Sequence, residues 1–176
     1  MKEIWTIGHS THAIQEFISM LRSFHIQCLA DIRHIPASRR NPQFSKTDLE
    51  RSLREAGIAY VHLPELGGHR KPVPGSKNDG WKNTSFRGYA DYMETEEFEK
   101  GITTLTGLAK EQRTVYMCAE AVWWSCHRSL VSDYLKVRGW KVMHIMGIEK
   151  AVEHPYTSPA KVNKGQLTYG KNPGLF

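Results

Sequence analysis

The segment CAEAVWWSCHRS, residues 118–129, holds a large share of the reactive side-chain types in this chain. Within it lie two thiols, a carboxylate, an imidazole, a guanidinium and two indoles. Three kinds of chemistry are open to such a set: metal binding, nucleophilic catalysis by a cysteine, and acid–base catalysis by a carboxylate. The spacing of the residues and the elements around them discriminate between these three.

Metal binding is disfavoured by the spacing. Structural zinc sites usually pair thiolates two to four residues apart in sequence. Seven residues separate Cys118 from Cys126, and Cys126 is adjacent to His127, so these two side chains point in different directions on a regular element. We therefore expect no metal and no other cofactor.

A cysteine nucleophile is the second possibility. A strand that ends at Cys118, followed by a loop and by a helix that opens near Arg128, is the layout of rhodanese sulfurtransferases and of phosphatases that use a phosphocysteine. A helix N-terminus and an arginine lower a thiol pKa and bind an oxyanion. The spacing here is C-x9-R without a glycine, which disfavours a tight loop of amides around a small anion. A rhodanese-like or cysteine-phosphatase-like enzyme using Cys118 or Cys126 is therefore our alternative prediction.

A catalytic carboxylate is the third possibility, and we prefer it. Glu120 lies two residues beyond Cys118, on the same face of an extended chain, and the adjacent indoles can exclude water and raise its pKa. Indoles also stack on an extruded nucleobase, while Glu120 or Asp31 activates water and His127 protonates the leaving base. The predicted function is a nucleic-acid-directed hydrolase, such as a DNA glycosylase or another base-repair enzyme. The predicted catalytic residues are Glu120, Asp31, His127 and Cys118.

The charge of the chain favours a polyanionic partner. There are 24 Lys and Arg against 18 Asp and Glu, which gives a net charge of +6 and a pI near 9.3. Residues 33–46 contain four Lys or Arg and no acidic residue, so this segment can follow a phosphate backbone of DNA or RNA. A non-catalytic nucleic-acid-binding module needs only this surface and the aromatic residues, and it is a third alternative. The predicted substrate-binding residues are His9, Ser10, Arg33, Arg39, Arg40, Arg70, Lys71, Trp123, Trp124 and Arg128.

Strands and helices alternate along the sequence. Hydrophobic spacing predicts strands at 4–9, 28–33, 59–63, 114–119 and 141–145, and helices at 14–24, 45–56, 86–94, 96–111 and 129–138. This alternation implies right-handed crossovers and a parallel sheet. We predict one α/β domain over residues 1–176, with a mainly parallel five-stranded sheet and helices on both faces. Ligands of such sheets bind beyond the carboxyl ends of the strands, where polar residues follow all five predicted strands.

Two segments fall outside this alternation. Residues 64–84 are rich in Pro, Gly, Lys and Asn and are too long for a routine connection, so we expect a functional or mobile loop. Residues 148–176 form a basic, turn-rich tail with one possible short strand at 166–169. With three cysteines, no signal-peptide pattern and no apolar run of about 18 residues, we expect a cytoplasmic protein without a membrane span. Nothing in the sequence indicates an oligomeric state.

Several motifs, taken together and in this order, resemble domain-of-unknown-function family 488. They are Thr6-Ile-Gly-His-Ser10, Asp31-Ile-Arg33, Leu66-Gly-Gly-His-Arg70, Cys118-Ala-Glu120, Cys126-His-Arg128 and Val142-Met-His-Ile145. The resemblance covers nearly the whole chain and implies that these motifs occur together. It therefore implies that the residues at the strand ends form one site, and it brings no assigned reaction.

Overall fold

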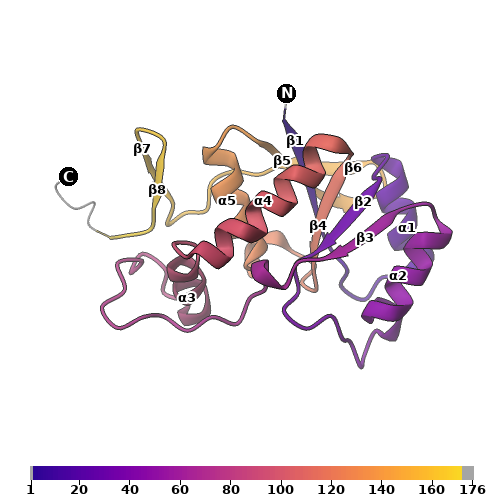
Figure 1. Ribbon diagram of the computed structural model, residues 1–176, viewed down its shortest axis with the longest axis horizontal. Coiled ribbons are helices and arrows are strands. Elements are labelled where there is room, and N and C mark those ends of the chain that lie inside the picture. Colours follow the sequence, from indigo (N-terminus) through magenta and orange to yellow (C-terminus); the bar gives the residue numbers. More distant parts are fainter. Residues whose placement is uncertain (1, 172–176) are drawn as a thin grey trace.

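A six-stranded sheet forms the centre of the computed structural model, which describes residues 2–171 (Figure 1). Its strands, in sequence order, are β1 (Glu3–Gly8), β2 (Cys28–Asp31), β3 (Ala59–His62), β4 (Thr114–Cys118), β5 (Lys141–Gly147) and β6 (Lys150–Glu153). In space the order is β3-β2-β4-β1-β5-β6, and every pairing is parallel except that of β5 with β6. The predicted α/β fold with a mainly parallel sheet is confirmed.

The sixth strand corrects the predicted count of five. β6 returns antiparallel beside β5 after a tight turn and lies at the edge of the sheet. Most of its residues are exposed, so it lacks the apolar run or the alternation that marks a strand in sequence. The prediction of a turn-rich tail therefore missed it.

Helices cover both faces of the sheet, as predicted. They are α1 (Ile14–Ser23), α2 (Lys46–Glu55), α3 (Thr84–Tyr92), α4 (Glu96–Glu111) and α5 (Arg128–Val137). Alternate residues of a strand point to opposite faces. On β4, Val115 and Met117 pack with residues of α1 and α2, whereas Tyr116 packs with residues of α4 and α5. The two hydrophobic cores therefore hold the sheet between two helical layers.

The long segment between β3 and α3 is tied to α3 by one buried carboxylate. The segment begins with a 3₁₀ turn (η2, Pro64–Leu66), and residues 67–83 after it contain no helix or strand. Asp91 accepts hydrogen bonds from the Val73 amide at 2.9 Å, the Ser76 hydroxyl at 2.7 Å and the Asn78 side-chain amide at 2.7 Å. These bonds fix the path of the segment where it passes the carboxyl end of the sheet.

The tail is tied to α5 in the same way. It forms a hairpin of β7 (Lys161–Asn163) and β8 (Gln166–Thr168). Asp133 of α5 is fully buried and accepts hydrogen bonds from His154, Thr157 and Tyr169.

Of the helices within residues 2–171, none has the length and apolar character to cross a membrane.

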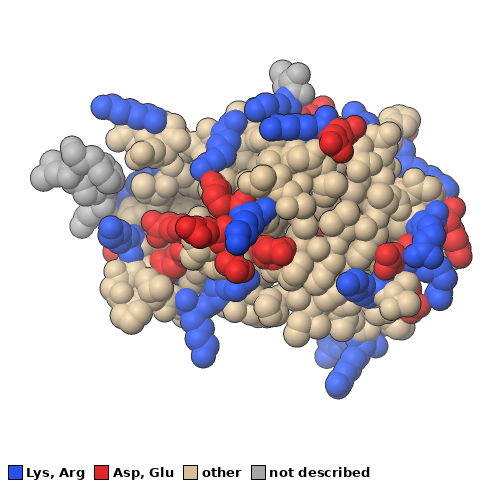
Figure 2. Space-filling model, in the orientation of Figure 1, with Lys and Arg blue, Asp and Glu red and all other residues tan. Residues whose placement is uncertain are grey.

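Charge is unevenly distributed over the surface. Figure 2 shows acidic side chains gathered at the start of α4, whose first turn contains Glu96, Glu97 and Glu99. Lys and Arg side chains lie beside these acidic residues in the same view, and Arg138 lies 3.9 Å from Glu99, so this face carries both signs of charge.

Candidate active site

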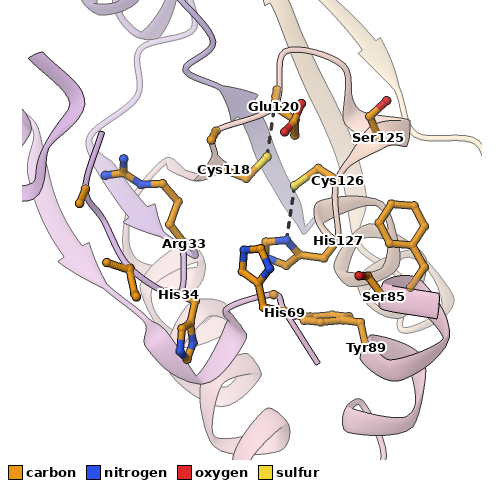
Figure 3. Close-up of a pocket in the computed structure, with 15 residues that line it drawn as sticks. Arg33, His34, His69, Ser85, Tyr89, Cys118, Glu120, Ser125, Cys126 and His127 are labelled. Atoms are coloured by element: carbon orange, nitrogen blue, oxygen red, sulfur yellow. Dashed lines mark hydrogen bonds between the residues drawn. The ribbon is translucent and has the colours of Figure 1, made fainter. Parts of the chain in front are cut away.

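A cavity of about 390 Å³ opens at the carboxyl edge of the sheet. Its walls come from the end of β4, the residues before α5, the segment after β2, the segment after η2, and α3 (Figure 3). Two of the three cysteines of the chain, Cys118 and Cys126, line it. Both are almost fully buried, with 2% and 5% of their surface exposed. The cavity therefore brings together the two thiols of the CAEAVWWSCHRS segment.

Cys126 lies directly before α5 and has the environment of a thiolate. Its Sγ accepts a hydrogen bond from the Arg128 amide at 3.4 Å and lies 3.5 Å from His127 Nδ1. Burial raises the pKa of this thiol, but the neighbouring Cys118, the Arg128 charge and the Arg128 amide together outweigh burial. The net result is a Cys126 pKa below its ordinary value.

Cys118 has the opposite environment. It is the last residue of β4, and its Sγ donates to the Glu120 carbonyl oxygen at 3.8 Å. Burial raises the pKa of Cys118 well above its ordinary value, and the neighbouring Cys126 raises it further. Of the two thiols, Cys126 is therefore the more acidic.

Arg128 is a buried cation beside this pair. Only 1% of it is exposed, and its one hydrogen bond from the guanidinium reaches the Ala121 carbonyl oxygen at 3.4 Å. Within the described part of the chain, its Nε and Nη1 have no hydrogen-bond partner and no carboxylate lies within 4.0 Å of it. An uncompensated buried charge is strongly unfavourable. The Arg128 charge lowers the pKa of Cys126, so a thiolate formed there is stabilised by this cation.

Gly8 makes this arrangement sterically possible. A Cβ at this position would lie 1.6 Å from the Glu120 carbonyl oxygen and 2.9 Å from Arg128 Nη1. The loop after β4 therefore passes directly over the end of β1, and only glycine fits there. This is the physical reason for a glycine in the Thr6-Ile-Gly-His-Ser10 motif.

His127 is oriented to take the Cys126 proton. Its Nε2 lies 3.1 Å from the Ile32 carbonyl oxygen, which can only accept, so Nε2 carries the hydrogen. Burial lowers the His127 pKa, so the ring is neutral and Nδ1 is free to accept. Since Nδ1 faces Cys126 Sγ, the tautomer fixed by Ile32 is the one required of a base.

The two predicted catalytic carboxylates lie in different environments. Asp31 is fully buried and accepts from Arg33 Nε at 2.9 Å, Arg33 Nη2 at 2.7 Å and the Tyr60 hydroxyl at 2.6 Å. These partners occupy both of its oxygens. Among the described residues 2–171, Asp31 is not one of those that line the cavity. Glu120 does line the cavity, at its exposed rim.

The two indoles of the segment point to different places. Trp123 stacks on His144 at 4.7 Å and meets His154 edge-on at 5.0 Å. It therefore anchors the loop to the buried Asp133–His154–His144 hydrogen-bond chain. Trp124 remains 56% exposed.

A family model matches residues 13–135 of the chain. Its description is Domain of unknown function DUF488. The chain belongs to this family. No curated protein matches the chain, and no solved structure does. The DUF488 match includes Cys118, Cys126, His127 and Arg128, so the cysteine pair lies inside the family region.

Most of the predicted substrate-binding residues of this DUF488 chain lie outside the cavity wall. Arg33 lines it. His9 is buried, stacks on Phe44 at 4.4 Å, and has its pKa lowered to about 4 by burial. Arg70 lies over the Tyr92 ring at 3.7 Å. The other predicted residues also do not line the cavity: Ser10, Lys71, Trp123, Trp124, Arg128, and Arg39 and Arg40, which are exposed on the 33–46 segment.

Sequence reasoning missed His69 as a wall residue. It lines the cavity with a backbone φ of 62°, a conformation that non-glycine residues seldom adopt. The preceding glycines are required by close packing, because a Cβ on Gly67 would lie 2.7 Å from His34 Cα and one on Gly68 would lie 3.0 Å from His127 Nδ1. In the sequence, the glycine pair at 67 and 68 was the feature that could have indicated this part of the cavity wall.

Among residues 2–171, no group of three or more His, Cys, Asp or Glu side chains is arranged to hold a metal ion.

Proposed function

We propose that the protein is a cysteine-dependent sulfurtransferase of the rhodanese type, with Cys126 as its nucleophile. The observation that carries the proposal is Arg128, a buried cation with no carboxylate partner in residues 2–171, placed beside a thiol at a helix N-terminus. Such surroundings favour a thiolate, which is the reactive form of cysteine. This was the alternative prediction from sequence; the nucleic-acid-directed hydrolase stays a prediction.

The first half-reaction loads sulfur onto Cys126. His127 Nδ1 accepts the proton of the thiol, and the thiolate attacks the outer sulfur of a sulfane donor such as thiosulfate. A bond forms between Cys126 Sγ and that sulfur, and the sulfur–sulfur bond of the donor breaks, so that sulfite leaves with the electron pair. Arg128 and the first amide of α5 stabilise the persulfide anion that remains.

The second half-reaction passes the sulfur to a nucleophilic acceptor. The acceptor attacks the outer sulfur of the persulfide, the bond to Cys126 Sγ breaks, and the thiolate is restored. Cyanide or a thiol can serve, since either is a nucleophile towards sulfane sulfur.

Sulfur transfer fits this site better than phosphate hydrolysis does. A cysteine phosphatase needs several amides that converge on the three oxygens of a phosphoryl group. Here the Arg128 amide donates to Cys126 Sγ and the Ser129 amide donates to the Cys126 carbonyl oxygen. The singly charged outer sulfur of a persulfide requires fewer donors.

Thiocyanate formation from thiosulfate and cyanide tests the proposal. We expect activity in the wild type and in Cys28→Ser, because Cys28 lies at the start of β2 and away from the cavity. Cys126→Ser should lose activity and should take up no sulfur in intact-mass spectra. Unchanged sulfur transfer by Cys126→Ser, or failure of Cys126 to take sulfur from any sulfane donor, would overturn the proposal.

One observation supports a nucleic-acid partner as a second proposal. Trp124 and Ile35, which lines the cavity, are 56% and 70% exposed, and Arg39 and Arg40 are exposed on the same basic segment as Ile35. Exposed aromatic and basic side chains are the groups that hold single-stranded nucleic acid. Fluorescence anisotropy with short DNA and RNA should show binding that weakens steeply with salt and with Trp124→Ala. Binding that is independent of salt would contradict it.

A further inference from the structure

We propose that Cys118 resolves the Cys126 persulfide, so that the site reduces sulfane sulfur to sulfide through a Cys118–Cys126 disulfide. This inference rests on the proposed function and adds an activity to it. A plain sulfurtransferase needs one cysteine, and the second thiol at the base of this cavity has no part in that reaction.

The positions of the two thiols support the inference. Cys118 ends β4 and Cys126 precedes α5, and both side chains line the same cavity (Figure 3). The two thiols are close enough for Cys118 to lower the pKa of Cys126. Cys28, the remaining cysteine, pairs in register with Thr114 at the opposite end of β4, so it is too far away to compete.

The step between the thiols balances in atoms and electrons. Cys118 Sγ attacks Cys126 Sγ, and a disulfide bond forms between them. The bond from Cys126 Sγ to the outer sulfur breaks, and that sulfur leaves as hydrosulfide with the electron pair and the Cys118 proton. The sulfane sulfur gains two electrons, and the two cysteine sulfurs together lose two.

The protonation states of the two cysteines set the order of events. Arg128 and the α5 amide lower the Cys126 pKa and His127 faces its Sγ, so Cys126 is the first of the two thiols to lose its proton and attack the donor. Cys118 is kept as a thiol by burial and retains the proton that the departing sulfur needs. The pair is therefore divided into an attacking and a resolving residue.

Formation of the disulfide requires the two sulfur atoms to approach to about 2 Å. The loop backbone is held in place, because the Ser10 amide donates to the Ala119 carbonyl oxygen at 2.9 Å and Arg128 donates to the Ala121 carbonyl oxygen. The approach therefore comes from rotation of the Cys118 and Cys126 side chains into the cavity that both line. An external thiol that enters the cavity then reduces the disulfide in two exchange steps and restores both cysteines.

A single-turnover experiment without external thiol tests the inference, with thiosulfate as the probe under anaerobic conditions, because thiosulfate releases sulfite and any sulfide must come from the persulfide. The wild type should become about 2 Da lighter and release about one sulfide per chain, as should the matched control Cys28→Ser. Cys118→Ser should instead become about 32 Da heavier on Cys126 and release no sulfide. Cys118→Ala provides a second variant, and circular dichroism checks that each variant is folded.

The outcomes separate the two proposals. If the wild type gains about 32 Da and holds the sulfur until a thiol is added, resolution by Cys118 is wrong and the sulfurtransferase stands. If Cys118→Ser releases sulfide as the wild type does, the inference is again wrong. If neither protein takes up sulfur on Cys126, the sulfurtransferase itself is wrong, and the inference falls with it.

Discussion

Arg33 and Arg128 are both buried at the carboxyl edge of the sheet, yet their charges are compensated differently. Arg33 donates to both oxygens of Asp31, at 2.9 Å and 2.7 Å to Nε and Nη2. Arg128 has one bond, to the Ala121 carbonyl oxygen at 3.4 Å. A carboxylate neutralises the first cation and leaves it structural. The second cation has no carboxylate partner within residues 2–171, and in the proposed reaction it stabilises first the Cys126 thiolate and then its persulfide.

Breaking the first pair should have the largest effect. Asp31→Asn leaves the Arg33 charge buried without its partner, and loss of one member of a buried pair costs about 3–5 kcal/mol of the free energy of unfolding. Urea denaturation measures it. The control is Asp48→Asn, since Asp48 forms an exposed ion pair with Arg51 that contributes about 0–1 kcal/mol. Equal small losses in both variants would contradict a structural role for Asp31.

Replacing Arg128 should alter reactivity more than stability. Arg128→Met removes the cation beside Cys126, so the thiol pKa rises and the rate of alkylation at pH 7 falls by about tenfold for each pKa unit. Arg128→Lys keeps the charge and should retain most of the rate. The stability loss should be smaller than in Asp31→Asn, because Cys126 can bind a proton once the cation is gone. An unchanged alkylation rate in Arg128→Met would show that Arg128 is not the counter-ion.

Each arginine has a histidine beside it, and His9 beside Arg33 gives a pH dependence. Its Nε2 lies 3.4 Å from Arg33 Nη1, and burial lowers its pKa to about 4. The folded protein therefore keeps His9 neutral below about pH 6.5, where the unfolded chain binds a proton. Between that pH and about 4, the free energy of unfolding should fall by up to about 1.4 kcal/mol per pH unit through this group.

Urea denaturation across this pH range measures the slope. His9→Gln should flatten it, whereas His25→Asn, a change at an exposed histidine with a φ of 57°, should leave it as it is. Identical slopes in the wild type and His9→Gln would contradict the buried neutral state of His9.

The smallest effect is expected at Glu120. Its carboxylate lies at the exposed rim of the cavity, and its charge raises the Cys126 pKa less than Arg128 lowers it. Glu120→Gln should change thiocyanate formation by no more than about twofold, as should the control Glu97→Gln on α4, because exposed charges are screened by solvent. Loss of activity in Glu120→Gln, with normal activity in Glu97→Gln, would contradict this expectation and favour catalysis by the Glu120 carboxylate.

The sequence was sufficient to predict the fold because its signal is local. Apolar alternation and helix-like spacing gave the five strands and five helices of the α/β sandwich, and the rule for parallel sheets placed the site at the carboxyl edge. β6 escaped because an exposed edge strand carries no such pattern. Asp133, which ties His154, Thr157 and Tyr169 to α5, escaped because its partners are distant in the sequence.

The sequence indicated several residues that line the cavity, but not which of their charges neutralise one another. Cys118, Glu120, His127 and Arg33 were expected there, and all four line the cavity. Which charges neutralise one another depends on contacts that sequence spacing does not give. Asp31 lies two residues from Arg33 and pairs with it, whereas Arg128 lies eight residues from Glu120 and forms no ion pair with it. That difference is why we propose chemistry at the thiols rather than at the carboxylates.

The pH profile of alkylation at each cysteine of the wild-type protein, resolved by peptide mass spectrometry, tests the central claim most directly. Cys126 should react with iodoacetamide with a midpoint below about 8.5, the ordinary value for a thiol, because Arg128 and the α5 amide stabilise its thiolate. Cys118 should remain unmodified over the same range. A Cys126 midpoint above the ordinary value, or alkylation of Cys118 first, would contradict the account.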